Sequence, residues 1–382
     1  MTEMTLPAID QQHVVDLAAE LTAIPSQATN ELEVAEVVYR ELDRPGIDLH
    51  IEEVVKGRAN VVAKVRGVGE RPPLVLSGHL DASVSERWSR DPYQPWIADG
   101  RLYGAGVDDM KGAVASMIAA VQTAADGRVR LGGDLILHAV MHHDTIGLGE
   151  KYVLASEGPD EGYAICGEPS SMDIHTANGG ALKFSVRFTG ETAHISRLEG
   201  ARDALAAAVA GYNAINELEL PHEPCDRLQH LPRKLIGRLQ AGFDPGKVAE
   251  VAELNGDIRT VPGMKRDVIK QVIRDAVTDA CPNDIEVDVR ITAVQRPFIG
   301  PQSGHLIDTI VAAHTAVRGR APEITSRLPT QAFVTDASDL AAHGLETVVY
   351  GPGDWHFGPD QSVGVAELAD AARIYLGVAA TL

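Results

Sequence analysis

The sequence predicts an α/β protein, in which a mostly parallel β-sheet with helices on both faces is interrupted by an inserted α+β domain. Two short, nearly continuous apolar runs, at 73–79 (PLVLSGH) and 134–142 (DLILHAVMH), are typical of strands that are buried on both faces. A helical segment lies between them, and strand–helix–strand order favours a parallel sheet. With 382 residues, the chain is long enough to form two compact units.

The elements of the first unit follow in order along the chain. Apolar residues recur at helical spacing over 9–24, which predicts a helix before the strand at 73–79. A second helix is predicted at 111–125, where Asp108 or Asp109 is available to cap it. After the insert, the same pattern resumes with ETVVYGPG and a final helix near 363–380. We therefore assign residues 1–178 and 295–382 to the α/β domain.

The insert, residues 179–294, has a different texture. Apolar and polar residues alternate strictly in ALKFSVRFTG (181–190) and IEVDVRIT (285–292), which indicates antiparallel strands with one solvated face. Helical stretches are predicted at about 202–216 and 265–279, between these two strands. This order is typical of a ferredoxin-like βαββαβ domain.

Composition excludes several classes of protein. The net charge is −20 without any Lys/Arg-rich run, so neither nucleic acid nor an anionic membrane is an expected partner. The three cysteines are far apart, which suggests free thiols in a reducing compartment. No signal peptide is visible and no apolar run reaches about 18 residues. We expect a cytoplasmic protein without a membrane span.

Polar, metal-capable side chains follow several predicted strands. His79 and Asp81 end the first buried strand, and Asp81 is placed to hold the second ring nitrogen of His79. Taken singly, such residues have ordinary explanations, such as a solvated strand end or a helix cap. Ligands collect beyond the carboxyl ends of parallel strands, so their recurrence there favours one site. Carboxylates and imidazoles without thiolates suit zinc, manganese or cobalt. The candidates are His79, Asp81, Asp108 or Asp109, His143, Asp144, Glu168 and His356.

The sequence of these segments resembles that of the M20 metallopeptidase/amidohydrolase family, which includes acetylornithine deacetylase, succinyl-diaminopimelate desuccinylase and carboxypeptidase G2. The resemblance is carried by LSGHLDA, WSRDPYQPWIADGRLYGAGVDDMKG, CGEPS, GETAHIS, GDIRTVPG, VTDASDLAAHG and YGPGDWHFGPD, in this order over nearly the whole chain. It implies a metal-dependent exopeptidase-like α/β domain, with the insert as a lid and dimerisation domain. It also implies one or two divalent metal ions per chain and a homodimer or larger homo-oligomer.

The resemblance also implies roles for individual residues. His79, Asp109 and Glu168 would face one metal ion, with Asp109 bridging to a second ion held by Asp144 and His356. Two ions held in this way can activate one water molecule. In the insert, His194 would face the substrate oxyanion and Arg259 would bind a substrate carboxylate through its planar fork. Backbone N–H groups of Gly351 and Gly353 would lie near the same end of a small substrate.

One stretch departs from the family pattern, which has two consecutive glutamates where this chain has His143 and Asp144. The first glutamate is a general base and the second a metal ligand. Asp144 keeps a carboxylate on a shorter arm. His143 can act as the base, because an imidazole titrates near neutral pH, or it can become a metal ligand, with His142 as a further candidate.

Three hypotheses follow from this departure. The first is an amidohydrolase or deacylase that uses His143 as its base. The second is an aminohydrolase in which metal-activated hydroxide displaces ammonia from an electron-poor aromatic carbon, for example that of a nitroanthranilate. The third is an inactive metal-binding scaffold. A two-lobed solute-binding protein is a further alternative, but it has no need of imidazoles and carboxylates at several strand ends.

Overall fold

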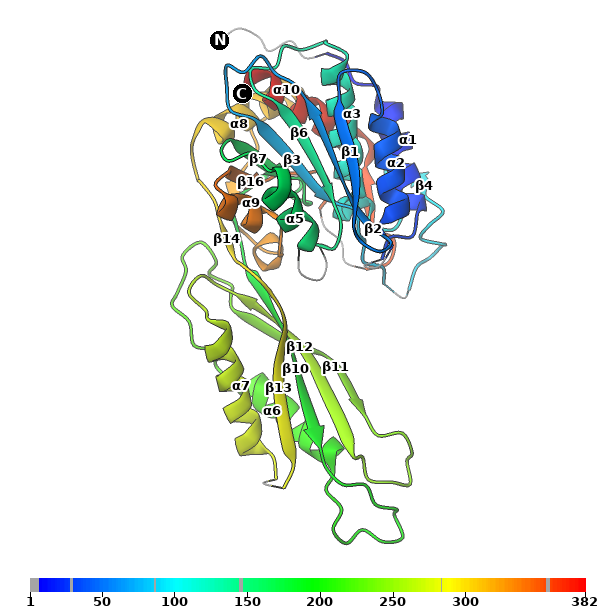
Figure 1. Ribbon diagram of the computed structural model, residues 1–382, viewed down its shortest axis with the longest axis vertical. Coiled ribbons are helices and arrows are strands. Elements are labelled where there is room, and N and C mark those ends of the chain that lie inside the picture. Colours follow the sequence, from blue (N-terminus) through cyan, green and yellow to red (C-terminus); the bar gives the residue numbers. More distant parts are fainter. Residues whose placement is uncertain (1–6, 28–29, 86, 144–146, 283, 355–357) are drawn as a thin grey trace. The chain divides into compact units, whose positions relative to one another are not determined.

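The computed structural model describes residues 7–27, 30–85, 87–143, 147–282, 284–354 and 358–382 (Figure 1). The chain divides into two compact units. Unit 1 comprises Met1–Ala177, Phe298–Thr330 and Thr335–Leu382, and unit 2 comprises Asn178–Pro297 together with Gln331–Val334. Unit 2 therefore draws on a short second segment, 331–334, which sequence patterns did not single out.

Unit 1 is built on an eight-stranded sheet in the order β1-β2-β6-β3-β7-β16-β8-β15. Its centre is parallel, because β3 pairs in parallel with both β6 and β7, and β7 pairs in parallel with β16. The predicted α/β class is confirmed. The strands are β1 (Asp48–Val55), β2 (Arg58–Val65), β3 (Leu74–His79), β6 (Leu135–Val140), β7 (Tyr163–Cys166), β8 (Ile174–His175), β15 (Ile324–Thr325) and β16 (Glu346–Val349).

The central strands are apolar throughout because their two faces pack into different cores. In β3, Leu74 and Leu76 belong to one core and Val75 to the other. In β6, Leu135 and Leu137 face the first core while Ile136 faces the second. Alternate side chains of a strand point to opposite faces, so a strand covered on both sides must be apolar at successive positions.

Helices cover both faces of this sheet (Figure 1). The first core takes side chains from α1 (Gln11–Ala23), α2 (Leu32–Leu42), α3 (Gly112–Ala125), α8 (His305–Arg318) and α10 (Val365–Thr381). The second core takes side chains from α5 (Leu148–Glu157) and α9 (Ala337–His343). Smaller elements of the chain are β4 (Trp96–Ala98), β5 (Arg101–Tyr103), η1 (Val107–Lys111), β9 (Ala177–Asn178), β14 (Phe298–Ile299), η2 (Thr330–Ala332) and β17 (Ser362–Gly364).

The expected cap of α3 is wrong. The N-cap position is Lys111, and no side chain caps the helix there. Asp108 and Asp109 lie in the preceding turn η1, where the backbone of Asp109 is extended rather than helical, with φ −132° and ψ 86°. With this backbone conformation, the Asp109 carboxylate does not cap the first turn of α3.

Unit 2 has the predicted βαββαβ order, which is confirmed. It contains β10 (Gly180–Thr189), α6 (Ala204–Glu217), β11 (Arg233–Ala241), β12 (Val251–Thr260), α7 (Arg266–Ala280) and β13 (Glu286–Gln295). The sheet order β11-β12-β10-β13 is antiparallel throughout. Phe184, Val186 and Phe188 of β10 are buried in the core of this unit, while Arg187 between them is exposed. The strict alternation of apolar and polar residues therefore reflects a sheet with one buried face.

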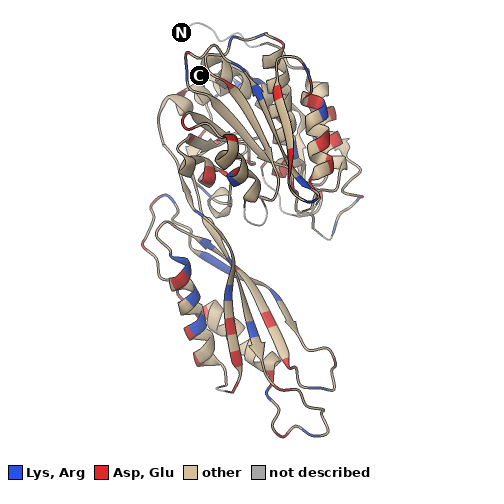
Figure 2. Cartoon of the chain, viewed as in Figure 1, with Lys and Arg blue, Asp and Glu red and all other residues tan. Residues whose placement is uncertain are grey.

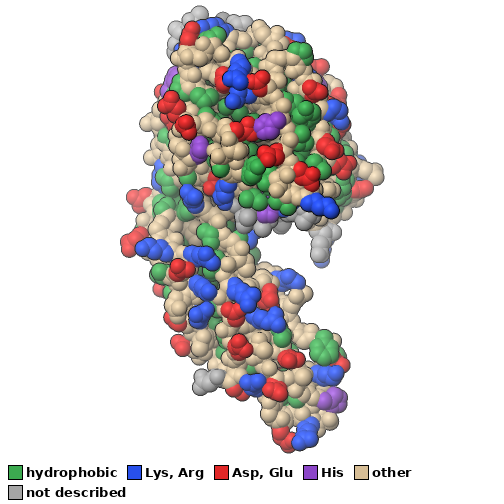
Figure 3. All heavy atoms as spheres, viewed as in Figure 1, with side chains coloured by type: hydrophobic (Ala, Val, Ile, Leu, Met, Phe, Trp, Pro, Cys, Tyr) green, Lys and Arg blue, Asp and Glu red, His purple; other side chains and the backbone are tan. Residues whose placement is uncertain are grey.

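Charged residues of both signs occur in both units. Basic and acidic residues both occur along α7 (Figure 2), and they are interspersed on the face drawn in Figure 3. Among the helices that are described, none is long and apolar enough to cross a membrane. The three cysteines, Cys166, Cys225 and Cys281, are free.

Candidate metal centre

The carboxyl ends of three neighbouring strands bring polar side chains together in unit 1. β6, β3 and β7 are adjacent and parallel, so their carboxyl ends meet at one edge of the sheet. His79 is the last residue of β3, and His143 and Glu168 lie shortly after β6 and β7. Each strand is held in place by two cores, which gives these side chains a rigid base.

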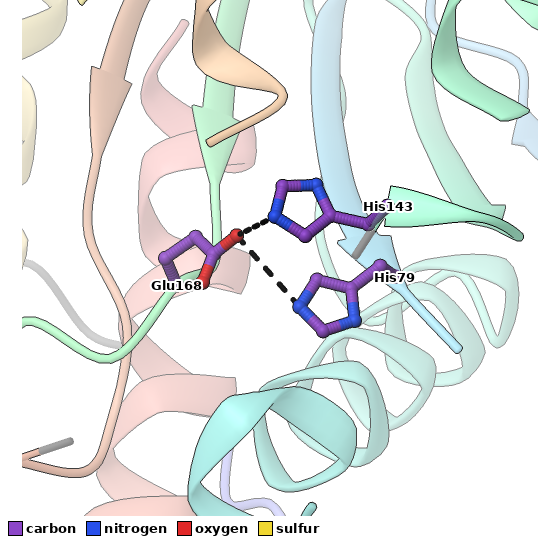
Figure 4. Close-up of side chains that lie close together, drawn as sticks. All are labelled: His79, His143 and Glu168. Atoms are coloured by element: carbon purple, nitrogen blue, oxygen red, sulfur yellow. Dashed lines mark ion pairs between the residues drawn. The ribbon is translucent and has the colours of Figure 1, made fainter. Parts of the chain in front are cut away.

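His79, His143 and Glu168 form a compact buried cluster (Figure 4). Glu168 Oε1 lies 3.7 Å from His79 Nε2 and 3.5 Å from His143 Nε2. The two imidazole rings are stacked, with centroids 4.5 Å apart and planes 6° from parallel. Both Nε2 atoms therefore face the same carboxylate.

Asp109 joins this cluster from the turn η1. Its Oδ1 atom lies 3.1 Å from His79 Nε2, and its side chain is 23% exposed, while His79 is buried. The carboxylate thus reaches the ligand atom of His79 from the more open side of the cluster. Four groups that can bind a divalent cation meet here.

The cluster fits a bound cation. One buried oxygen, Glu168 Oε1, receives no hydrogen bond from the described residues, and its contacts with the histidines are too long for hydrogen bonds. The candidate ligand atoms of His79, His143 and Glu168 lie within 4.8 Å of one another. Imidazole nitrogen and carboxylate oxygen are ligands that zinc and its first-row neighbours accept.

Burial and neighbouring charges shift the pKa values in this cluster. Burial raises the pKa of Glu168 to about 8. For His143, burial disfavours the charged ring, but the carboxylate of Asp336 opposes it, and the pKa rises to about 10. In His79, burial is outweighed by Asp109 and Glu168, which raise its pKa well above the ordinary value. The raised pKa values of these three groups favour bound protons, so cations and protons compete for their donor atoms.

Asp336 belongs to this site, although sequence reasoning gave it no role. It lies at the start of α9, is buried, and places Oδ1 3.0 Å from Nδ1 of His143. Its only signal in the sequence is its place in the VTDASD stretch of the family resemblance. That stretch has no spacing that would link Asp336 to His143.

Asp81 touches both histidines, but through atoms that spacing did not predict. Nδ1 of His79 contacts the backbone carbonyl of Asp81 at 2.8 Å, whereas the carboxylate Oδ1 is 3.7 Å away. The same Oδ1 accepts a hydrogen bond of 3.1 Å from the backbone N–H of His143. Asp81 therefore ties the ends of β3 and β6 to each other.

The segment Met141–His143 is held by buried side-chain acceptors from separate parts of the chain. The N–H of Met141 donates to Asn60 Oδ1 at 3.0 Å and that of His142 to Glu31 Oε1 at 3.1 Å. Glu31 is itself paired with the buried Arg58, whose Nε lies 2.7 Å from Oε2. His142 has a positive φ of 64°, a left-handed conformation that is unfavourable for its side chain. We call this arrangement the 141–143 clamp.

The remaining predicted residues of unit 1 lie in two groups. Asp144 and His356, the expected ligands of a second ion, lie outside the described residues. Gly351 and Gly353 follow β16 and are buried. The N–H of Gly351 donates to Ser170 Oγ at 3.0 Å. It is thus engaged within the protein rather than directed to a substrate.

The predicted residues of unit 2 are polar and accessible. His194 is exposed, and its Nδ1 lies 2.8 Å from Ser196 Oγ. Arg259 lies on β12, with its Nε 3.1 Å from Asp257 Oδ1 and its side chain 33% exposed. Their proposed contacts with a substrate stay predictions.

Comparisons with known proteins give a consistent answer. The model of peptidase family M20/M25/M40 matches residues 75–381. An acetylornithine deacetylase from Aliivibrio salmonicida is 27% identical over 330 residues, covering 81% of this chain and 80% of that protein. A probable succinyl-diaminopimelate desuccinylase from Staphylococcus epidermidis is 27% identical over 382 residues, covering 91% of this chain and 92% of that protein.

Solved structures share the fold of this chain. Human carnosine dipeptidase 1 superimposes with a TM-score of 0.78 at 16% identity, and the match covers 97% of each chain. A metallo-carboxypeptidase from Sulfolobus solfataricus gives a TM-score of 0.76 at 14% identity, covering 97% of this chain and 99% of that one. At these identities, the likeness concerns the fold alone.

Proposed function

The chain belongs to peptidase family M20/M25/M40, and on this premise we propose that it is a metal-dependent hydrolase of amide C–N bonds in small, carboxylate-bearing molecules. One observation carries the proposal: His79, His143, Glu168 and Asp109 meet at the carboxyl ends of adjacent parallel strands. The deacetylase and desuccinylase relatives favour an N-acetyl or N-succinyl amide over a peptide as the substrate.

In this proposal, the protein's residues bind the metal ion and orient the substrate. A divalent zinc, manganese or cobalt ion would supply an electrophile and would lower the pKa of a water molecule. His79, His143 and Glu168 would hold it, and Asp109 would approach from the more exposed side. Arg259 would grip the substrate carboxylate, because a guanidinium presents paired donors to two oxygens. His194 would donate to the carbonyl oxygen as negative charge develops there.

His143 favours a second candidate function. One ring nitrogen faces Asp336 and the other faces Glu168, so the ring is placed to bind a cation rather than to carry a proton to a leaving amine. Expulsion of an alkyl amine from an amide needs such a proton. An electron-poor aromatic ring delocalises the negative charge of the addition step into its own substituents, and the amino group takes up a proton given by the attacking water and leaves as ammonia. Displacement of ammonia from an aminoaromatic acid such as a nitroanthranilate is therefore the alternative.

Product analysis separates the two candidates. The protein, loaded with Mn²⁺ or Zn²⁺, is incubated with N-acetyl and N-succinyl amino acids and, in parallel, with nitroanthranilates. Mass spectrometry follows the organic product beside an ammonia assay. Free acid plus amino acid supports the amidohydrolase, and ammonia plus a hydroxylated ring supports the aminohydrolase. If the metal-bound protein forms no product from either set of substrates, an inactive scaffold would be favoured.

Assembly and location complete the proposal. The edge strand β11 carries exposed Leu235 and Leu239, and unpaired edge strands readily join a second copy. We propose a homodimer formed through unit 2, to be tested by light scattering of the wild type against Leu235→Lys. The cytoplasmic location stays a prediction.

A further inference from the structure

We propose that Asp336 is a positioning residue that fixes the ring of His143, so that its Nε2 atom, and not Nδ1, binds the metal ion. The inference rests on the proposed metal site but not on the reaction assigned to it. His143 lies between two carboxylates, those of Glu168 and Asp336. The histidine therefore needs an explanation of its own.

The two ring nitrogens of His143 face different carboxylates. Nδ1 lies 3.0 Å from Asp336 Oδ1, and Nε2 lies 3.5 Å from Glu168 Oε1. A neutral imidazole carries one proton, and a carboxylate beside one nitrogen holds the proton there. Asp336 thus selects the tautomer in which the Nδ1 of His143 is protonated. In the neutral ring that would bind a metal ion, after Nε2 has given up any proton, the lone pair on Nε2 points into the cluster.

The ring has little freedom to turn away. It is stacked on His79 at 4.5 Å, and the backbone N–H of His143 is held by Asp81. His143 is only 7% exposed. Rotation of the ring would break the contact with Asp336 inside a buried site, where an unpaired carboxylate is costly. The geometry of a ligand is therefore present before any ion binds.

Asp336 is itself fixed by secondary structure. Its backbone carbonyl accepts hydrogen bonds from the N–H groups of Asp339, at 2.9 Å, and Leu340, at 3.1 Å, at the start of α9. Leu340 lies in the second core of unit 1, which anchors the helix against the sheet. The carboxylate is thus attached to a packed helix, and a shift of Asp336 would require a shift of α9.

The other histidine of the cluster provides a contrast. Nδ1 of His79 contacts a backbone carbonyl, that of Asp81, at 2.8 Å. A carbonyl is a neutral acceptor, whereas Asp336 is a carboxylate, and a carboxylate makes the imidazole a stronger donor to a metal. The two stacked rings therefore differ in ligand strength. Loss of Asp336 should weaken the site through His143 and leave His79 in place.

Metal affinity tests this inference without reference to catalysis. Co²⁺ and Zn²⁺ dissociation constants are measured by competition with a chromogenic chelator, and the visible spectrum of the Co²⁺ protein is recorded. We expect Asp336→Ala to weaken binding by about 10- to 100-fold and to change the Co²⁺ spectrum. Asp336→Asn, which keeps the shape without the charge, should show a smaller loss. The matched control is Asp173→Asn, another buried, ion-paired carboxylate, which lies outside the cluster.

A double variant separates positioning from general loss of structure. In a His143→Ala background, Asp336→Ala should cause no further loss of metal affinity, because the ring on which it acts is gone. A further loss of similar size would overturn the inference, as would wild-type affinity and an unchanged spectrum in Asp336→Ala. A wild-type protein that binds neither ion would overturn the proposed metal site and this inference together. Normal metal binding without hydrolysis would overturn only the proposed reaction.

Discussion

Arg58 provides the sharpest test of the 141–143 clamp. Its guanidinium pairs with Glu31 through Nε and Nη2, and the two side chains are 7% and 0% exposed. Glu31 Oε1 also accepts the backbone N–H of His142. Replacement by methionine keeps an unbranched side chain of similar length but leaves the Glu31 carboxylate buried without its cation.

The expected loss follows from this burial. Removing one partner of a buried ion pair costs about 3–5 kcal/mol, because the remaining charge is uncompensated. The double variant Glu31→Gln/Arg58→Met removes both charges and keeps an amide oxygen for the N–H of His142. We expect the double variant to recover at least about 2 kcal/mol of the loss, since an imperfectly paired buried amide costs only about 1–3 kcal/mol.

Urea denaturation, followed by circular dichroism, measures these differences. The matched control is Arg40→Met, whose side chain is 54% exposed and pairs with Glu20 and Glu41 at the surface. That variant should lose less than about 1 kcal/mol. Hydrogen exchange at the amides of residues 141–143 should also accelerate in Arg58→Met. An Arg58→Met protein as stable as the Arg40→Met control would refute the reasoning, and so would a double variant less stable than the single one.

Three further predictions concern the metal centre and the core. Asp109→Ala should abolish hydrolysis and weaken Co²⁺ binding at least about 10-fold, because the open side of the cluster loses its carboxylate; full activity would remove Asp109 from the site. Saturating Zn²⁺ at 100 times its dissociation constant should raise the free energy of unfolding by about 2.7 kcal/mol, and a chelator should reverse this; an unchanged urea midpoint would argue against a built site. Burial lowers the pKa of His314 to about 4, so the unfolded chain binds a proton that the folded chain does not, and stability should fall by roughly 1.5 kcal/mol as pH drops from 6.5 to 5. His314→Gln should flatten that part of the profile, and a profile identical to that of the wild type would contradict the role of His314.

The architecture was largely predictable from the sequence because burial leaves a direct record in residue type. The runs at 73–79 and 134–142 are apolar at successive positions since each strand packs into two cores. The alternation in β10 records one covered face. His79 was also predictable as a site residue, because it ends a predicted strand and ligands collect at the carboxyl edge of a parallel sheet.

The contacts inside the site were less predictable, because they depend on the path of the chain after each strand. Asp81 was expected to contact His79 through its carboxylate, but the turn after β3 presents its backbone carbonyl instead. The link between Asp336 and His143 joins the start of α9 to the end of β6. No local spacing encodes such a pair, so its detection required the fold.

Asp109 shows how one local pattern permits two outcomes. An aspartate just before a helix is usually a cap, and the sequence around α3 is compatible with that role. The tertiary structure prevents it, because the extended backbone of Asp109 directs its carboxylate to His79. Only the position of His79 on the neighbouring strand β3 distinguishes the two.

The left-handed backbone of His142 means that the residue favoured at position 142 in directed evolution depends on the property that is selected. A non-glycine residue in this conformation costs about 1 kcal/mol or more, so a screen for heat resistance would favour glycine there. Glycine would also free the backbone next to His143, so a screen for metal retention would favour histidine. Homologues adapted to different temperatures should therefore vary at this position more readily when their metal supply is abundant than when it is scarce.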